Sequence, residues 1–419
     1  MHDVMLESLA FGGDAVGRIN GKVVFVPLGA PGDRVRLRLL KQTATYSSGE
    51  ILEVLEPGPG RREPPCPHFG VCGGCQWQHI VYDEQAAAKA EVFEAALAEA
   101  EAEQLVPLAR APQELGYRRR VRWHFAARGG HVVLGYFRRR SQDLLEIGRC
   151  PLLVDPLRLA MERCREAMGV VGTARGTVVA LAGGEGEVHL SIRLERGERD
   201  DHEALAEREL GAPIVGGLVQ HGDQERSFGA ASVNLMLPEE PPLAGSAGAF
   251  AQASADQDHL LRRRVSSWAG AGEGRVLELF AGVGNLTRDL AADGAEVVAV
   301  ESSPASAELL LQNVESLPGS VTVLAQDAEE AVLNLISRRE RFDVVVLDPP
   351  REGCARVTAL LPELGARRIV YVSCDPMTLA RDLVRLVEHA RGYRVERAGA
   401  IDMMPQTYHV EGVALLHRR

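Results

Sequence analysis

Long apolar runs are missing from this sequence of 419 residues. No stretch approaches the roughly 20 apolar residues that a membrane-spanning helix requires, so we expect no membrane partner. The N-terminal Met1-His2-Asp3-Val4 lacks the basic-then-apolar order of a secretory signal peptide, which predicts a cytoplasmic protein. An excess of positive charge is also missing, because the formal net charge is −11. The overall charge therefore argues against binding of nucleic acid through a uniformly basic surface.

The composition is that of a folded soluble chain, with 46% hydrophobic and 25% charged residues. Because one core rarely organises so long a chain, we expect about two to four domains. Between Arg110 and Arg140 the charge is locally reversed, with nine arginines and one glutamate among aromatic residues. Arginines and aromatic rings together suit RNA phosphates and unstacked bases. A solvated strand face explains the same stretch equally well.

The order of patterns along the chain predicts three regions. Short alternating segments between glycine turns are typical of a small β-barrel. An alanine-rich acidic stretch, 83–103, predicts a helix that packs on the C-terminal region. Strand-like alternation over about 115–240 is followed by a Pro/Gly-rich linker, 238–248. Beyond it strands and helices alternate, which predicts a doubly wound sheet. The expected regions are 1–56, 57–248 and 249–419.

A glycine turn in the C-terminal region predicts a nucleoside site. The expected strand Arg275–Phe280 runs into Ala281-Gly282-Val283-Gly284-Asn285 and then a helix. Glu301 ends the next strand 19 residues after Gly282, where an acidic side chain typically binds ribose hydroxyls. The third glycine of the dinucleotide fingerprint is missing, so S-adenosylmethionine fits better than NAD. Asp327 either accepts a hydrogen bond from adenine or caps the next helix. The expected cofactor-binding residues here are Phe280, Gly282, Gly284, Asn285, Glu301 and Asp327.

Two further strands end in residues that can perform chemistry. Asp348-Pro349-Pro350 follows one apolar strand and Ser373-Cys374-Asp375-Pro376 follows another. Ligands bind at this edge of open α/β sheets, where a thiol can act as a nucleophile, although a buried inert cysteine is also common. Methylation of carbon 5 of a pyrimidine requires a thiolate that adds to carbon 6 and a base that removes the carbon 5 proton. Glu411 and His409 are the candidate bases.

These segments resemble the RNA uracil-5-methyltransferase family. The similarity is carried by Ser373-Cys374-Asp375-Pro376, Asp348-Pro349-Pro350-Arg351 and the segment 402–411. It implies that Cys374 is the nucleophile, that Glu411 is the base and that Asp348 is an active-site aspartate that also faces the cofactor. Arg351 matches a motif position and is expected to assist the uracil or a phosphate.

Two positions depart from the family's pattern. Phe250-Ala251-Gln252-Ala253-Ser254 resembles the segment Phe-Phe-Gln-x-Asn that opens the catalytic domain of the family. Gln252 keeps the glutamine that faces substrate or cofactor, whereas Ser254 replaces the asparagine. Glu278 stands in the first strand where aspartate is more usual, so its contact with the methionine end of the cofactor is open.

Four cysteines form a candidate metal site. Cys66, Cys72 and Cys75 lie within ten residues, and Cys150 is a distant fourth. Structural zinc prefers two C-x2-C pairs and this set has one, so four irregularly spaced thiolates favour an iron–sulfur cluster over zinc. The resemblance implies a 4Fe–4S cluster with a structural role. Cys164 and Cys354 match no motif and are expected to be ordinary core or surface residues.

The N-terminal segments 10–18 and 21–27 look like a TRAM domain, an OB-like RNA-binding barrel. A TRAM domain together with the cysteine set is typical of the ribosomal-RNA branch of the family. The expected architecture is therefore a TRAM barrel, a central β-rich domain with the cluster, and a Rossmann-like class I methyltransferase domain. The expected RNA contacts are Arg118, Arg119, Arg120, Arg122 and Arg351.

The resemblance implies a monomeric enzyme that uses S-adenosylmethionine to methylate carbon 5 of a uridine in 23S ribosomal RNA through a covalent Cys374–carbon 6 adduct. The same chemistry on a transfer RNA uridine is one alternative. A non-catalytic iron–sulfur RNA-binding protein that assists ribosome assembly is another, from a different class.

Overall fold

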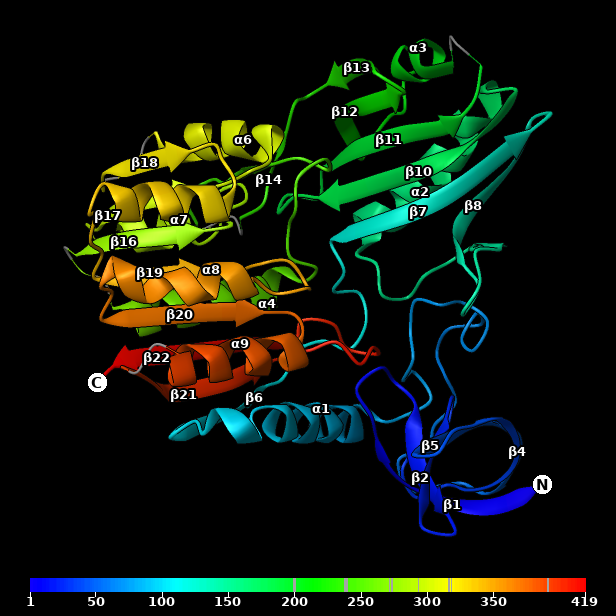
Figure 1. Ribbon diagram of the computed structural model, residues 1–419. Helices are drawn as coiled ribbons and strands as arrows, with labels where there is room; N and C mark the ends of the chain where they lie inside the picture. The colour runs from blue at the N-terminus through cyan, green and yellow to red at the C-terminus, as the bar shows by residue number, and fades with distance from the viewer. Residues whose placement is uncertain are drawn as a thin grey trace.

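The computed structural model contains a barrel, a central sheet and a larger sheet covered by helices (Figure 1). It describes all residues except 199, 200, 237–239, 271, 273, 293, 316, 318, 390 and 391. Positions 238 and 239 of the predicted linker therefore lie outside the described residues. No helix within the described part of the chain is both long enough and apolar enough to span a bilayer.

Residues 1–56 form the predicted barrel, which is closed by five strands in the order β1-β2-β3-β5-β4. Alternate side chains point inward, so Val24, Val26, Val35 and Leu37 are fully buried. The irregular segment 57–81 leaves the barrel but remains attached to it, because Trp77 packs into the barrel core and its Nε1 donates a hydrogen bond to the Gly13 carbonyl at 3.0 Å. The strands are β1 (His2–Leu9), β2 (Ala15–Ile19), β3 (Lys22–Val26), β4 (Arg34–Gln42) and β5 (Tyr46–Glu56).

The predicted acidic helix is shorter than 83–103. It forms α1 (Tyr82–Ala96) and a 3₁₀ turn, Ala98–Ala100, and the chain then passes through Glu101 in a left-handed conformation, φ +49°. The following β6 (Gln104–Ala109) pairs in parallel with β21 (Tyr393–Ile401) and is the edge strand of the C-terminal sheet. The helix packs on the C-terminal region as expected, because Phe93 lies in the core of that region. Residues 104–109 extend its sheet, although they fall within the expected central range, 57–248.

The central region is a seven-stranded sheet in the order β13-β12-β11-β10-β7-β8-β9. Helix α2 (Asp155–Ala167) buries Leu157, Met161 and Cys164 against one face. The short helix α3 (Asp201–Ala206) lies near β12 and β13 (Figure 1). The strands are β7 (Arg120–Arg128), β8 (His131–Phe137), β9 (Leu144–Glu146), β10 (Thr173–Ala182), β11 (Val188–Arg196), β12 (Ile214–His221) and β13 (Gln224–Gly229), and the pair β14 (Val233–Asn234) and β15 (Ala244–Gly245) leads out of the region.

The C-terminal region is the predicted doubly wound sheet, with the order β18-β17-β16-β19-β20-β22-β21-β6. Strands such as Val344–Leu347 are buried along their whole length, as expected for parallel strands that helices cover on both faces. Helices α4, α5 and α6 cover one face, and α1, α7, α8 and α9 cover the other. The remaining strands are β16 (Arg275–Leu279), β17 (Glu296–Val300), β18 (Val321–Leu324), β19 (Val344–Leu347), β20 (Arg368–Ser373) and β22 (Glu411–Arg418). The remaining helices are α4 (Ala255–Ala269), α5 (Thr287–Ala292), α6 (Pro304–Val314), α7 (Ala328–Ser337), α8 (Ala355–Leu360) and α9 (Pro376–His389).

Candidate active site

The register of the sheet brings the predicted nucleophile and base together. Strands β20 and β22 run antiparallel and pair Ser373 with Gly412. One residue further along each strand, Cys374 and Glu411 therefore lie opposite one another at the sheet edge. Asp348 ends the neighbouring strand β19, which pairs with β20 in parallel. Residues that are 26 to 63 positions apart in the sequence thus meet at one edge.

Cys374 is partly exposed at this edge. Burial raises the pKa of its thiol to about 12, and the carboxylates of Glu411 and Asp348 contribute to this increase. The Arg351 guanidinium opposes the increase only in part. The thiol is therefore protonated in the resting enzyme, although Cys374 lies just before the N-terminus of α9.

Glu411 and Asp348 are two carboxyl groups in one poorly solvated site. Burial raises the pKa of Glu411 well above its ordinary value, and the charge of Asp348 adds to this effect. Burial also raises the pKa of Asp348, to about 7, and the charge of Asp258 adds to it. Because like charges at close range do not both ionise readily, Glu411 holds a proton at neutral pH, whereas Asp348, with a pKa of about 7, is ionised in about half of the molecules.

Arg351 links the nucleophile loop to the C-terminal loop. Its Nε lies 3.3 Å from an Asp375 carboxylate oxygen, and its Nη2 lies 3.4 Å from the Tyr408 hydroxyl. Asp375 also caps α9 by accepting hydrogen bonds from the backbone N–H groups of Met377 and Thr378. About half of the Arg351 side chain is exposed, so its guanidinium can still reach a substrate.

The glycine loop after β16 forms the floor of a separate pocket. Phe280 adopts a left-handed conformation with φ +63°, which is rare for an aromatic residue. At Gly282 an added Cβ would meet open space, whereas at Gly284 it would lie 2.7 Å from the Leu310 side chain. Glu301 accepts hydrogen bonds from the Gly282 and Ser303 backbone N–H groups, at 2.9 and 2.7 Å.

Glu278 lies in this pocket with an unused acceptor. It is 1% exposed, and its Oε2 makes no hydrogen bond of good geometry among the described residues. Burial raises the pKa of Glu278 to about 8, although the nearby Thr287 hydroxyl and N–H oppose this increase in part. A buried carboxylate oxygen without a full partner is costly unless a ligand satisfies it. The ammonium group of S-adenosylmethionine would do so, and the pocket residues therefore fit this cofactor.

Replacement of Glu278 by glutamine is expected to weaken S-adenosylmethionine binding by at least about tenfold, because a charge-assisted hydrogen bond is lost. In the wild type the affinity should fall as the pH decreases below about 8, because the carboxylate must lose its proton to bind a cation. Calorimetry in buffers of different ionisation enthalpy should detect proton release that the variant lacks. Glu308→Gln, on the exposed side of α6, should bind like the wild type; unchanged affinity in Glu278→Gln would contradict this role.

A second depression beside Phe280 is more open than the pocket around Glu278. The Asp327 side chain is exposed and caps α7 by accepting from the Glu329 and Glu330 N–H groups. The capping role considered for Asp327 is therefore present in the structure, and its contact with adenine remains a prediction. Phe280 and Asp327 line one depression together with Cys354. Cys354, expected to be an ordinary residue, is buried and lies 3.4 Å from the Tyr371 hydroxyl.

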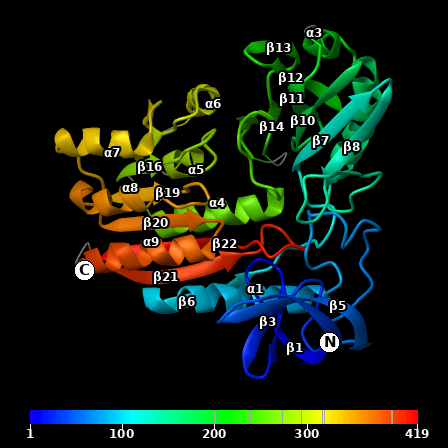
Figure 2. The same cartoon turned by 45° about the vertical axis from the view of Figure 1, so that its right-hand side comes forward.

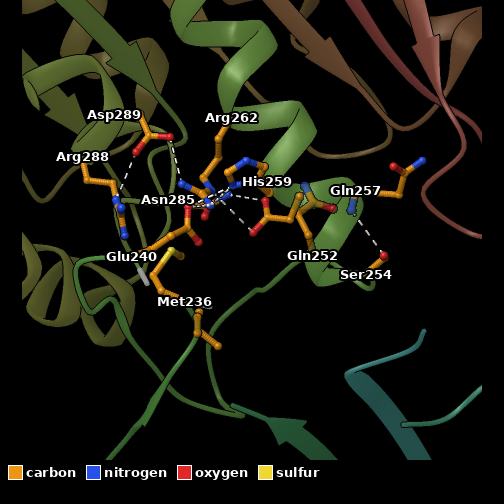
Figure 3. A network of polar contacts seen from close by, with 12 residues as sticks. Met236, Glu240, Gln252, Ser254, Gln257, His259, Arg262, Asn285, Arg288 and Asp289 are labelled. Atoms are coloured by element: carbon orange, nitrogen blue, oxygen red, sulfur yellow. Dashed lines mark hydrogen bonds and ion pairs between the residues drawn. The ribbon is translucent and has the colours of Figure 1, made fainter. Parts of the chain in front are cut away.

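A buried polar network supports the methionine end of the pocket, and Figure 3 shows much of it around α4. Asp258 accepts from Asn285 Nδ2 at 2.7 Å and from Arg119 Nη2 at 2.9 Å. Arg119 also donates to the Gln252 carbonyl at 3.1 Å. Arg262, 3% exposed, forms ion pairs with Glu240 and Asp289. The network fixes Gln252 and Asn285, both predicted cofactor residues, beside Glu278 and Asp348.

The structure corrects the interpretation of the arginine-rich stretch. Arg119 is only 6% exposed, and its donors are used by buried protein acceptors, so it cannot contact RNA in this conformation. The aromatic residues Tyr117, Trp123 and Phe125 are also buried and pack within the fold. Arg118, Arg120 and Arg122 keep partial or full exposure and remain predicted RNA contacts.

The four predicted metal-ligating cysteines line one cavity of about 400 Å³. Two separate segments supply these thiols: Cys66, Cys72 and Cys75 from one, and Cys150 from the other. Burial raises the pKa values of the first three thiols, and the proximity of Cys150 raises them further. Among the described residues, no three Cys, His, Asp or Glu side chains are placed to hold a single metal ion. Four cysteine thiols around a shared cavity are the kind of donor set that iron–sulfur clusters use.

Sequence reasoning missed several pocket residues. Asp258 has no motif of its own, since its function depends on Asn285 and Arg119, which are distant in sequence. Phe250 was quoted only as part of a motif, but its ring is 60% exposed beside the cofactor pocket and the Arg120 guanidinium lies 5.8 Å from its centre. An exposed aromatic ring at a pocket rim was not recognisable from hydropathy alone.

The fold and the pocket define a class I methyltransferase domain joined to an N-terminal barrel. The model of the tRNA (uracil-5-)-methyltransferase family matches residues 246–419, and the TRAM domain model matches residues 2–52. Both matches agree with the resemblance inferred from the sequence. In the structure the TRAM match coincides with the five-stranded barrel.

Proteins that match along the whole chain show which family of methyltransferases it belongs to. The chain is 33% identical to a 23S rRNA (uracil(1939)-C(5))-methyltransferase RlmD from Thiobacillus denitrificans, covering 98% of both chains. It is 34% identical to the protein of the same name from Pseudomonas entomophila, covering 98% of this chain and 92% of that one. A crystal structure of the Pyrococcus abyssi tRNA (uracil-54, C5)-methyltransferase with S-adenosyl-L-homocysteine is 25% identical and superimposes with a TM-score of 0.75 over 99% of this chain and 100% of that one. The chain therefore belongs to the RNA uracil-5-methyltransferase family, as predicted, and is an enzyme of that class.

Proposed function

We propose that this enzyme methylates carbon 5 of a uridine in 23S ribosomal RNA through a covalent bond between Cys374 and carbon 6 of the uracil. The observation that carries the proposal is the register that sets Cys374 opposite Glu411, beside a pocket that contains Asp348 and the buried carboxyl group of Glu278. The choice of 23S RNA is supported by the names of the relatives that match along the whole chain.

Carbon 5 of uracil is a weak nucleophile, and Cys374 overcomes this. Addition of its sulfur to carbon 6 produces an enolate with electron density on carbon 5. S-adenosylmethionine supplies a methyl group on a sulfonium, which carbon 5 takes. Glu411 then removes the carbon 5 proton, and the resulting electron pair expels the Cys374 thiolate. The target base has to leave its stack to reach this edge of the sheet.

The starting protonation state sets the order of proton transfers. The neutral Cys374 thiol gives its proton to the Asp348 carboxylate as the sulfur–carbon bond forms, and it regains that proton when the bond breaks. Glu411 starts protonated, so it first donates to the enolate oxygen and only then becomes a base. When the carbonyl reforms, that oxygen releases its proton to solvent. This is the one proton that each methyl transfer produces.

The cofactor and RNA contacts follow from the placement of the remaining residues. Glu301 and Asp327 would bind the ribose and adenine, while Gln252 and Glu278 would bind the methionine end. For the RNA, Arg351 at the mouth of the site would contact the uracil or its phosphate. Arg118, Arg120 and Arg122 would hold neighbouring phosphates, and the barrel would contact flanking nucleotides.

We further propose that Cys66, Cys72, Cys75 and Cys150 hold a 4Fe–4S cluster with a structural role. The support is that all four thiols line one cavity and that this donor set suits iron–sulfur chemistry. The cluster would tie the segment before α1 to the end of the β9 region. Metal and sulfide analysis of anaerobically purified protein should find about four iron and about four sulfide ions per chain. One zinc ion per chain without iron would refute the cluster.

The substrate is tested by methyl transfer from labelled S-adenosylmethionine to two RNAs, a 23S transcript and a transfer RNA transcript. We expect 5-methyluridine in the 23S transcript, and its loss from the 23S RNA of a strain lacking the gene. The transfer RNA alternative is favoured by the likeness to the Pyrococcus abyssi enzyme, and methylation of that transcript alone would establish it. Methylation of neither RNA, in the presence of bound cofactor, would favour an assembly factor.

A further inference from the structure

The loop between β21 and β22, residues 402–410, leads directly into Glu411. In Figures 1 and 2 this loop extends from the sheet toward the junction of the barrel and the central region. Ile401, just before the loop, pairs with Glu411 across the two strands. Any shift at the beginning of the loop is therefore transmitted to the residue that pairs with the base.

A buried ion pair fixes the first residue of the loop. Lys89 Nζ on α1 lies 2.6 Å from an Asp402 carboxylate oxygen, and both side chains are completely buried. The same Nζ donates to the Met404 carbonyl at 3.0 Å. The Tyr82 hydroxyl donates to the second Asp402 oxygen at 3.0 Å. Burial of an ion pair stabilises a fold only weakly, so such a pair points to a requirement for geometry rather than for stability.

A second clamp from α1 acts at Gln406. The Gln85 side chain donates to Gln406 Oε1 at 3.0 Å, and its own oxygen accepts from the Gln406 N–H at 2.9 Å. Gln406 has a left-handed backbone with φ +71°, a conformation that surrounding contacts must maintain in a residue other than glycine. Its carbonyl accepts from the N–H groups of Gln76 and Trp77, both at 3.1 Å.

We propose that Lys89 and Gln85 are positioning residues for this reaction, which hold the loop so that Glu411 faces Cys374. The proposal rests on the proposed role of Glu411 as the base. Neither residue lines the cofactor pocket, and both hold the loop directly, whereas Phe93 of the same helix packs beside the glycine that follows Glu411. Their effect should therefore concentrate on the step that uses Glu411 rather than on cofactor binding.

The test uses Lys89→Met, which keeps the side chain's length and removes its charge. We expect kcat to fall about 100-fold, since small displacements of a catalytic group have such effects, while the KM for S-adenosylmethionine stays at the wild-type value. With ordinary uridine RNA, the covalent RNA–protein complex should accumulate, because release depends on Glu411. Arg338→Met, which removes an exposed positive charge at the end of α7, is the control and should behave like the wild type.

Wild-type kcat in folded Lys89→Met protein would overturn the inference, and so would an equal loss of cofactor binding and of both chemical steps. If Lys89→Met does not fold, the same measurements are made on Gln85→Leu, which leaves the Lys89–Asp402 ion pair intact. The same results in that variant support or overturn the inference. The proposed function fails separately: in that case the wild type forms no covalent complex even with 5-fluorouridine RNA. A wild type that traps 5-fluorouridine RNA, together with no accumulation of complex on ordinary uridine RNA in either variant, refutes only the positioning role.

Discussion

Cys374→Ala is expected to lower the rate of methyl transfer by at least about 10⁴-fold, as the loss of a catalytic nucleophile commonly does. Without the sulfur, carbon 5 of uracil lacks the electron density to attack a sulfonium methyl. Binding of S-adenosylmethionine should remain at the wild-type level, because the cofactor pocket is built from the β16 and β19 edges and α4. Single-turnover methylation of the 23S transcript, measured beside calorimetric binding, separates these two effects.

The matched control is Cys164→Ala, a buried cysteine of the central sheet. It removes a more deeply buried thiol at a site remote from the pocket, so it should retain methyl transfer. We expect Cys374→Ala to keep about 10⁻⁴ of the wild-type rate or less. A variant that keeps a tenth or more of that rate would contradict the role of Cys374 as the nucleophile.

Glu411→Gln is expected to separate the two halves of the reaction. The glutamine amide can still donate a hydrogen bond to the enolate oxygen, so addition and methyl transfer should continue more slowly. Removal of the carbon 5 proton should slow further, by about 10²- to 10⁴-fold, the usual contribution of a general base. Methylated RNA should then remain bound covalently to the protein on denaturing gels. The wild type, which resolves the adduct, should show little of this species under the same conditions.

Glu388→Gln provides the control for Glu411→Gln, since Glu388 is exposed on α9. It should turn over normally and release its product. The role of Glu411 would be refuted by normal turnover in Glu411→Gln. If the variant instead stopped before methyl transfer, with no adduct on RNA, Glu411 would be required as the acid for addition rather than only as the base.

Much of the fold followed from local patterns. Alternation between glycine turns predicted the barrel, and strand–helix alternation predicted the doubly wound sheet, because both patterns record which faces are buried. The pairing of β6 with β21 did not follow, since it joins residues nearly 300 positions apart and local hydropathy does not specify a strand's partner. The shorter α1 reflects the left-handed Glu101, which has no sequence signal comparable to glycine.

The site residues were predictable where a reactive side chain adjoins the end of an expected strand. Cys374, Asp348 and Glu411 each adjoin a strand end, and the sheet register brings such ends together. Arg119 shows the limit of that reasoning, because within a run of arginines it looked like an RNA contact. Its partner Asp258 lies 139 residues away, and only the tertiary structure shows that the pair is buried.

The most direct test of the central claim is mass spectrometry of the complex trapped with 5-fluorouridine RNA and S-adenosylmethionine. Fluorine at carbon 5 cannot be removed as a proton, so the reaction should stop after methyl transfer. The tryptic peptide spanning residues 369–381, whose cysteine is Cys374, should carry a fluorouridine nucleotide plus one methyl group. An adduct on a different cysteine, or no adduct while RNA and cofactor are both bound, would contradict the account.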